Sequence, residues 1–179
     1  MNIRAFLFAL VLSTAPAHAF EIESADARNG GSVSNAQVAN VFGCDGLNLS
    51  PEIAWHDIPE GTQSFVVTVF DRDAPTGSGF WHWVVFDIPA SSTGLAAGSG
   101  TPDGKHLPAG SVQTRNDAGT SGYIGACPPL GSTHRYVITV KAVRVKTLGL
   151  DATASGALVG FLSNANKISE ATITTILSR

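Results

Sequence analysis

The stretch that decides the fold is residues 64–75, Ser-Phe-Val-Val-Thr-Val-Phe-Asp-Arg-Asp-Ala-Pro. Its first eight residues, 64–71, are mostly β-branched or aromatic, which is typical of a strand buried on both faces. Pro75 disfavours helix at the residue before it, so the chain is expected to stay extended beyond the strand. If it does, Asp71 and Asp73 project to one side. The sequence therefore predicts a buried strand with two carboxylates at its end.

Further strands are predicted on both sides of this stretch. Residues 82–88, HWVVFDI, form a strand that ends before Pro89, and His82 opens it at the end of a hairpin where the two aspartates are expected. Residues 135–145 alternate apolar and polar side chains, which indicates a longer strand with one solvated face. Shorter strands are expected at 20–24, 53–56 and 172–177. The fold class is mainly β.

One segment has helical spacing. In residues 155–168 four apolar side chains, Leu158, Phe161, Leu162 and Ala165, recur three or four positions apart, and Asp and Thr residues that can cap a helix precede them. We expect a helix packed on the sheet.

The first 19 residues have the features of a secretory signal peptide. Arg4 precedes an apolar run at 5–12, and small residues lead to Ala19. This run is shorter than the roughly 20 residues that a helix needs to cross a bilayer, and no later stretch is long and uncharged enough. We expect an exported chain in which residues 20–179 form one domain without a transmembrane segment.

Charge and cysteine content narrow the function further. The net charge of −3 comes from 11 Lys and Arg against 14 Asp and Glu, and no basic run is present, so nucleic acid is not an expected partner. Cys44 and Cys127 are the two cysteines. Because export leads to an oxidising compartment, we expect them to form a disulfide, and two free thiols near a pocket are the alternative.

A second group of residues that could carry chemistry lies at 122–131, Gly-Tyr-Ile-Gly-Ala-Cys-Pro-Pro-Leu-Gly, followed by His-Arg-Tyr at 134–136. A loop of Gly and Pro is rigid and lets a ligand approach backbone N–H groups. Together with 71–75, with Cys-Asp-Gly-Leu-Asn-Leu-Ser-Pro at 44–51 and with Arg-Asn-Asp at 115–117, these segments resemble the phosphatidylethanolamine-binding protein family, in its bacterial, Raf-kinase-inhibitor-like branch.

The resemblance implies a large antiparallel sheet, a smaller sheet beside it, peripheral helices, and a pocket for phosphate-type anions. It also implies a bacterial periplasm as the location, with secretion beyond it left open, and a homodimer. Tyr123 is a candidate for the pocket rim. The residues at the positions that line the family's pocket are Asp71, Asp73, His82, Pro129, His134 and Tyr136.

Two positions depart from the family pattern. The family's usual DPDAP is DRDAP here, and Arg72 is expected either to point away from the two aspartates or to pair with one of them. Ala126 stands before Cys127 where many relatives carry proline. Both walls of the pocket are expected to be less rigid as a result.

Two carboxylates beside a phosphate need compensation, because two unit charges about 4 Å apart repel by about 4 kcal/mol at an effective dielectric of 20. Protonated His82 and His134, the Tyr136 hydroxyl and loop N–H groups can supply it. Anion binding is then expected to weaken as the pH rises through ~6.5. Alternatively, one aspartate meets the ammonium group of a zwitterion such as phosphoethanolamine.

The expected function is that of a binding protein for a phosphate-type small anion or a phospholipid headgroup, with no cofactor. An inhibitor that acts on a partner protein through the pocket rim is the alternative. A metal site from Asp71, Asp73, His82 and His134 is chemically feasible, but the H-E-x-x-H and paired-cysteine patterns are missing, so no metal is expected. No G-x-S-x-G is present and Cys127 is expected in the disulfide, so we do not expect an enzyme.

Overall fold

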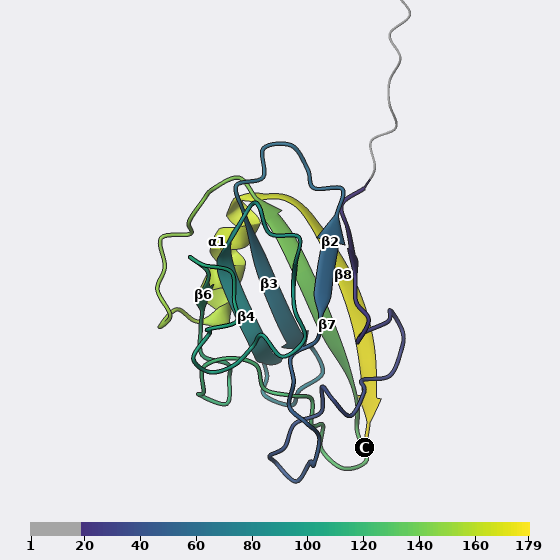
Figure 1. Cartoon of the computed structure of the whole chain (residues 1–179). Helices are drawn as coiled ribbons and strands as arrows, with labels where there is room; N and C mark the ends of the chain where they lie inside the picture. Colours follow the sequence, from purple (N-terminus) through teal and green to yellow (C-terminus); the bar gives the residue numbers. More distant parts are fainter. Residues whose placement is uncertain (1–18) are drawn as a thin grey trace, which may run out of the picture.

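The computed structural model describes residues 19–179 (Figure 1). The predicted signal peptide lies outside these residues apart from Ala19. The elements along the chain are β1 (Glu21–Glu23), β2 (Ile53–His56), β3 (Ser64–Asp71), β4 (Phe80–Pro89), β5 (Gly94–Leu95), β6 (Val112–Gln113), β7 (Thr133–Val143), α1 (Gly156–Ala165) and β8 (Lys167–Ser178).

The strands form two sheets whose neighbouring strands all run antiparallel. The larger sheet has the order β6-β4-β3-β7-β8, and the smaller one has the order β1-β2-β5. In Figure 1, α1 covers one face of the larger sheet near β4 and β6. Strand β2 of the smaller sheet lies on the side of β8. The prediction of a mainly β fold with a large and a small sheet is confirmed, and one α-helix is present in residues 19–179 where the resemblance implied several.

Strand β3 occupies the centre of the larger sheet because its apolar run can be buried on both faces. On one face, Phe65 and Val67 belong to the main core, together with Trp55 from β2. On the other face, Val66 packs in a second cluster that includes Val159 of α1. The strand therefore joins the two hydrophobic layers of the molecule.

Several boundaries differ from the sequence prediction. Strand β4 begins two residues earlier than 82, and β7 covers 133–143 instead of 135–145. Helix α1 ends at Ala165 instead of 168, because Lys167 already pairs with Val143 of β7. Strand β8 is accordingly longer than the predicted 172–177. Residues 167 and 168 form the start of β8, which pairs with β7, although the apolar spacing favoured a longer helix.

The start of α1 is set by Ser155, whose hydroxyl accepts a hydrogen bond from the backbone N–H of Leu158 at 3.2 Å. This is an N-cap, and it replaces the Asp and Thr caps expected from the sequence. No helix within residues 19–179 combines the length and apolarity needed to cross a membrane.

Cys44 and Cys127 form a disulfide, which confirms the expected pairing. The bond joins two loops that are 83 residues apart in the sequence. One of these loops follows β1 and the other precedes β7, so the disulfide fixes the Gly and Pro loop next to the end of the larger sheet.

The central position of β3 predicts how stability depends on its side chains. Phe65→Ala should lower the free energy of unfolding by about 3–5 kcal/mol, because it leaves a cavity beside Trp55 in the core. The matched control is Phe161→Ala on α1, where the ring is 70% exposed, and a change within about 0.5 kcal/mol is expected. Urea unfolding of both variants measures the difference. Equal losses would contradict the assignment of Phe65 to the core.

Candidate functional site

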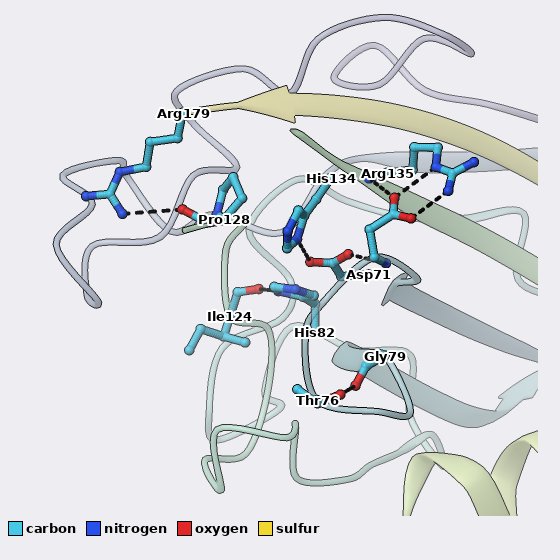
Figure 2. A network of polar contacts seen from close by, with 10 residues as sticks. Asp71, Thr76, Gly79, His82, Ile124, Pro128, His134, Arg135 and Arg179 are labelled. Atoms are coloured by element: carbon cyan, nitrogen blue, oxygen red, sulfur yellow. Dashed lines mark hydrogen bonds and ion pairs between the residues drawn. The ribbon is translucent and has the colours of Figure 1, made fainter. Parts of the chain in front are cut away.

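The candidate site lies at one end of the larger sheet, where three strands bring polar side chains together. Asp71 ends β3, and antiparallel pairing places it opposite Phe80 of β4 and Tyr136 of β7. His82 and His134 therefore come from the first few residues of their strands and lie beside the end of β3 (Figure 2). The convergence of Asp71 with His82 was predicted from the hairpin, and the place of His134 was implied by the family resemblance.

A cavity of about 180 Å³ opens at this point. Three segments surround it: the loop after β3, the Gly and Pro loop before β7, and the loop that carries Cys44. Its lining residues are Phe42, Asp71, Ala74, Pro75, Thr76, Phe80, His82, Ile124, Gly125, Cys127, Pro129, His134 and Tyr136.

The most buried polar contact of the site joins Asp71 and His134. His134 Nδ1 lies 2.6 Å from Asp71 Oδ2, and both side chains are buried. The other carboxylate oxygen, Oδ1, accepts the backbone N–H of Asp73 at 2.9 Å. Because both carboxylate oxygens are engaged, the ring of His134 is held in one orientation, with Nε2 as its remaining polar atom.

His82 is fixed in a different way. Its Nδ1 lies 2.8 Å from the carbonyl oxygen of Ile124, and since a carbonyl only accepts hydrogen bonds, this nitrogen carries the proton. Burial lowers the pKa of His82 below its usual value, which favours the neutral ring. Its Nε2 is then an acceptor. These surroundings disfavour the protonated His82 that was expected from the sequence.

Tyr136 lies between the two histidines, with ring centroids 5.2 Å from His82 and 6.5 Å from His134. Its hydroxyl is buried and has no hydrogen-bond partner among the described residues. Burial also raises the pKa of this phenol, so it stays protonated and able to donate. The ring lines the site cavity and also a second, internal cavity of about 20 Å³, which is large enough for one water molecule.

Asp73 lies apart from the cavity. Its carboxylate accepts hydrogen bonds from Arg135 Nε at 2.8 Å, Arg135 Nη2 at 2.5 Å and the Arg135 backbone N–H at 2.8 Å. The Arg135 guanidinium lowers the pKa of Asp73 to about 2. The prediction that Asp71 and Asp73 project to one side is therefore wrong, because Arg135 holds the second carboxylate away from the site.

Arg72, the departure from the family pattern, points away from both aspartates. It lines a groove on the opposite face of the larger sheet, with Phe70 and Trp81. Of the two alternatives expected for Arg72, pointing away from the aspartates is therefore the one observed, and pairing with one of them is not.

Tyr123 and Pro129 differ in their placement. Pro129 lines the cavity as expected from the resemblance. Tyr123 is buried in the core, where its hydroxyl donates to the carbonyl oxygen of Gln37 at 2.8 Å and its ring meets Trp83 edge-on. It is a structural residue behind the site, which corrects its assignment to the rim.

Sequence reasoning missed Phe42 and Arg179 in the wall beside Cys127, and it named Gly125 only as part of the loop at 122–131. Phe42 lines the cavity, and its place beside Cys44 could have indicated this once the disulfide was assumed. Gly125 approaches the backbone so closely that an added Cβ would lie 2.3 Å from Ala39 N, so no larger residue fits. Arg179 braces the same wall, and nothing in the local sequence pattern points to it.

The chemically feasible metal site is not assembled. Within residues 19–179, no three His, Cys, Asp or Glu side chains gather in an arrangement that could hold a metal ion. His134 Nδ1 is already hydrogen-bonded to Asp71, and His82 Nδ1 is already hydrogen-bonded to the carbonyl oxygen of Ile124.

The fold and site together define a two-sheet β protein of the binding class, with a histidine pair, a carboxylate and a phenol around a small cavity. The chain belongs to the phosphatidylethanolamine-binding protein family, whose family model matches residues 23–178. This confirms the resemblance noted from its motifs.

Two relatives and one solved structure illustrate the relationship. The chain is 47% identical over 171 residues to the UPF0098 protein YbcL of Escherichia coli K12, covering 95% of this chain and 93% of that protein. It is 48% identical over 155 residues to the UPF0098 protein YbhB of the same organism, covering 87% and 98%. The crystal structure of E. coli YbcL, described as a new member of the mammalian PEBP family, matches with a TM-score of 0.88 and covers 90% of this chain and 99% of that one.

The environment of His82 predicts an unusual titration. Its ring should remain neutral, with the proton on Nδ1, at pH 6.5, and should gain its second proton only at lower pH. Because the unfolded chain protonates this histidine first as the pH falls, the free energy of unfolding should decline below about pH 6.5. Nitrogen-15 NMR of the imidazoles measures the midpoint and the tautomer. A midpoint at or above 6.5 would contradict this account.

Proposed function

We propose that the cavity binds a small phosphate-type anion, either free or as the headgroup of a phospholipid, and that the chain is a binding protein without a catalytic step. The observation that carries the proposal is the Tyr136 hydroxyl, a buried donor without a partner at the wall of the cavity. Buried polar groups are nearly always hydrogen-bonded in native proteins, so an orphan donor beside a cavity marks a position for an acceptor.

The two histidines supply complementary groups. His134 carries its proton toward Asp71 through Nδ1, so when the ring is protonated its Nε2–H is a charged donor. The positive ring and the Asp71 carboxylate then balance each other. His82 Nε2 is an acceptor, which suits either the P–OH of a singly protonated phosphate or the ammonium group of a zwitterion such as phosphoethanolamine.

Asp73 lies outside the cavity, which reduces the negative charge that a bound anion would meet. One carboxylate instead of two faces the anion, and that carboxylate is already paired with His134. The repulsion that two free carboxylates would impose is therefore largely removed. No metal or cofactor is needed for binding of this kind.

We also propose that the chain is exported to the periplasm. The apolar run after Arg4, with the small residues that end at Ala19, supports export. The disulfide between Cys44 and Cys127 is consistent with an oxidising compartment.

The test is a titration of the oxidised protein with phosphoethanolamine and with inorganic phosphate, followed by NMR. Saturable shifts are expected at residues around the cavity. His134→Ala should abolish binding, whereas His106→Ala, which changes an exposed histidine outside the cavity, should leave it unchanged.

Tyr136→Phe gives the sharpest readout. It removes the orphan hydroxyl, so affinity should drop about tenfold or more, whereas the free energy of unfolding should be unchanged or higher, because no protein hydrogen bond is lost. If Tyr136→Phe and His134→Ala both bind phosphoethanolamine and phosphate like the wild type, the assignment of the cavity is wrong.

A further inference from the structure

The face of the larger sheet that points away from the main core is covered only in part. Helix α1 packs on it near β4 and β6 (Figure 1), where Val159 lies in a cluster with Val66 of β3. Beyond the helix, the same face has a groove of about 460 Å³, which is larger than the cavity of the candidate site and within the range of roughly 300–1,000 Å³ that is usual for ligand sites. We call it the open-face groove. Among residues 19–179 it shares no lining residue with the cavity, because side chains alternate between the two faces of each strand.

The floor of the open-face groove has a row of hydroxyl groups. Thr68 of β3, Thr139 of β7 and Thr172 of β8 all line it, and they occupy directly paired positions on three neighbouring strands. Adjacent strands lie about 4.8 Å apart, so the three hydroxyls follow one another across the floor at that spacing. Both edges of β3 and of β7 are already paired, so these strands offer a ligand hydroxyl donors and acceptors and no free backbone groups.

Three cations line the groove, and two of them lack a carboxylate partner. Lys141 is half-buried, and its ammonium group donates to two neutral oxygens, Asn164 Oδ1 at 2.7 Å and a serine hydroxyl at 3.4 Å. Glu170 lies opposite Lys141 in the sheet but pairs with Lys167 at 3.1 Å. No ion pair within residues 19–179 includes Lys141 or Arg72. The lining therefore has three positive charges and one negative charge, in a chain whose net charge is −3.

The position of Lys141 is unfavourable for a charge without an anionic partner, because burial removes part of its hydration. The same burial lowers the pKa of Lys141 below its usual value. An anion bound in the groove would supply the missing partner, which neither the asparagine nor the serine can replace.

Charged groups at the edges of the groove leave the positive surplus unchanged. Asp73 and Arg135 pair with each other. Asp117 accepts the backbone N–H of Trp81 at 2.8 Å, and Arg144 donates to a carbonyl oxygen of β8 at 3.1 Å. Because Asp117 and Arg144 have opposite charges, the two of them together add no net charge.

An aromatic pair forms one wall of the groove. The ring centroids of Phe70 and Trp81 lie 4.4 Å apart, and both side chains are half-buried. Gly156 of α1 leaves room for the indole, since an added Cβ would lie 2.6 Å from its Cγ atom, and Gly79 leaves room for the Phe70 ring in the same way. The two rings are therefore held in place, and they present a rigid apolar surface beside the hydroxyl row and the cations.

We propose that the open-face groove binds an acidic saccharide, with its hydroxyl groups on the threonine row, a ring face against Trp81 and its carboxylate on Lys141 and Arg72. A sugar ring has both hydroxyl groups and apolar C–H faces, which match the two kinds of surface in the groove. The positive surplus favours an acidic sugar over a neutral one. This site lies on the opposite face from the cavity, so the proposal goes beyond the proposed function and does not depend on it.

An acidic peptide fits the groove less well than an acidic saccharide. A peptide that binds a sheet usually adds a strand at a free edge, where backbone groups of the sheet pair with its amides. The groove lies on a face instead, and β3 and β7 have no free backbone groups for those amides. The hydroxyl groups of a sugar need only the side chains that the groove presents.

The test is a titration of the protein with tetragalacturonate, followed by nitrogen-15 NMR, with the methyl ester of the same sugar as the neutral probe. Saturable shifts are expected at residues 68–70, 137–141 and 170–172, and none at His82 or His134. The ester should bind about tenfold or more weakly than the acid, because its carboxylates are masked.

Variants assign the binding to particular side chains. Lys141→Gln removes the charge and keeps a hydrogen-bond donor, so the affinity for tetragalacturonate should fall about tenfold or more. Arg72→Gln, at an exposed position, should weaken binding in the same direction without affecting folding. Lys146→Gln is the matched control, since it removes an exposed lysine that does not line the groove and should bind like the wild type.

Thr139→Val tests the hydroxyl row. It removes one hydroxyl and keeps a β-branched side chain, so the urea midpoint should be unchanged, whereas the acid and the ester should both bind more weakly.

Several outcomes would overturn the saccharide site. Millimolar tetragalacturonate that causes no saturable shift, or shifts only residues of the cavity, contradicts it, as does equal affinity for the acid and the ester or for Lys141→Gln and the wild type. If hexaglutamate shifts the groove residues and tetragalacturonate does not, the groove binds an acidic peptide instead. If sedimentation velocity shows a dimer that Arg72→Gln dissociates, the groove is an interface between two copies. Binding of phosphoethanolamine at the cavity should be unchanged in Lys141→Gln, so failure of this proposal and failure of the proposed function are distinguishable.

Discussion

The structure depends on the burial of β3 between β4 and β7. This strand has partners on both edges and hydrophobic clusters on both faces, so its position and register are strongly determined. Its last residue, Asp71, is thereby fixed opposite Tyr136, with His134 two residues away in the same strand. Antiparallel pairing with β4 brings His82 to the same end. The site is thus a consequence of where the central strand stops.

A second constraint acts on charge. A carboxylate buried without a partner would be costly, and Asp71 avoids this through His134 and the backbone N–H of Asp73. Asp73 is instead paired with Arg135 at a half-exposed position, where it fastens the loop after β3 to the start of β7. The two aspartates therefore have different roles. Asp71 orients His134 in the cavity, and Asp73 holds the loop after β3.

The main strands and part of the candidate site could be predicted from the sequence, because they follow from local patterns. The apolar run of β3 and the alternation in β7 are properties of a few consecutive residues. The convergence of Asp71 and His82 follows from the hairpin that their strands form, whereas His134 was placed at the cavity by the family resemblance. The end of α1 was wrong because its apolar spacing continues into residues that pair with β7, and a local pattern does not reveal that competition.

The remaining differences come from contacts between distant parts of the chain. Asp73 lies 62 residues before Arg135, Tyr123 lies 86 residues after the carbonyl that it binds, and Arg179 is 137 residues from Phe42. Alternation along an extended chain predicted a common direction for Asp71 and Asp73. The Arg135 guanidinium on β7 instead holds the Asp73 carboxylate away from the cavity. The family resemblance pointed to residue types around the cavity and not to the partners that orient them.

The Tyr136 hydroxyl is the feature that stability alone does not explain. A buried donor left without a partner costs about 1–3 kcal/mol, whereas phenylalanine would fill nearly the same space without that penalty. The neighbouring groups show the opposite behaviour, since His82, His134 and Tyr123 each place a polar atom on a protein acceptor. The polar atoms of these neighbours are satisfied by the protein, and the exception belongs to a ring that lines the cavity. An unsatisfied donor at this position is consistent with the proposed binding of an acceptor, because the hydrogen bond would form only when the ligand binds.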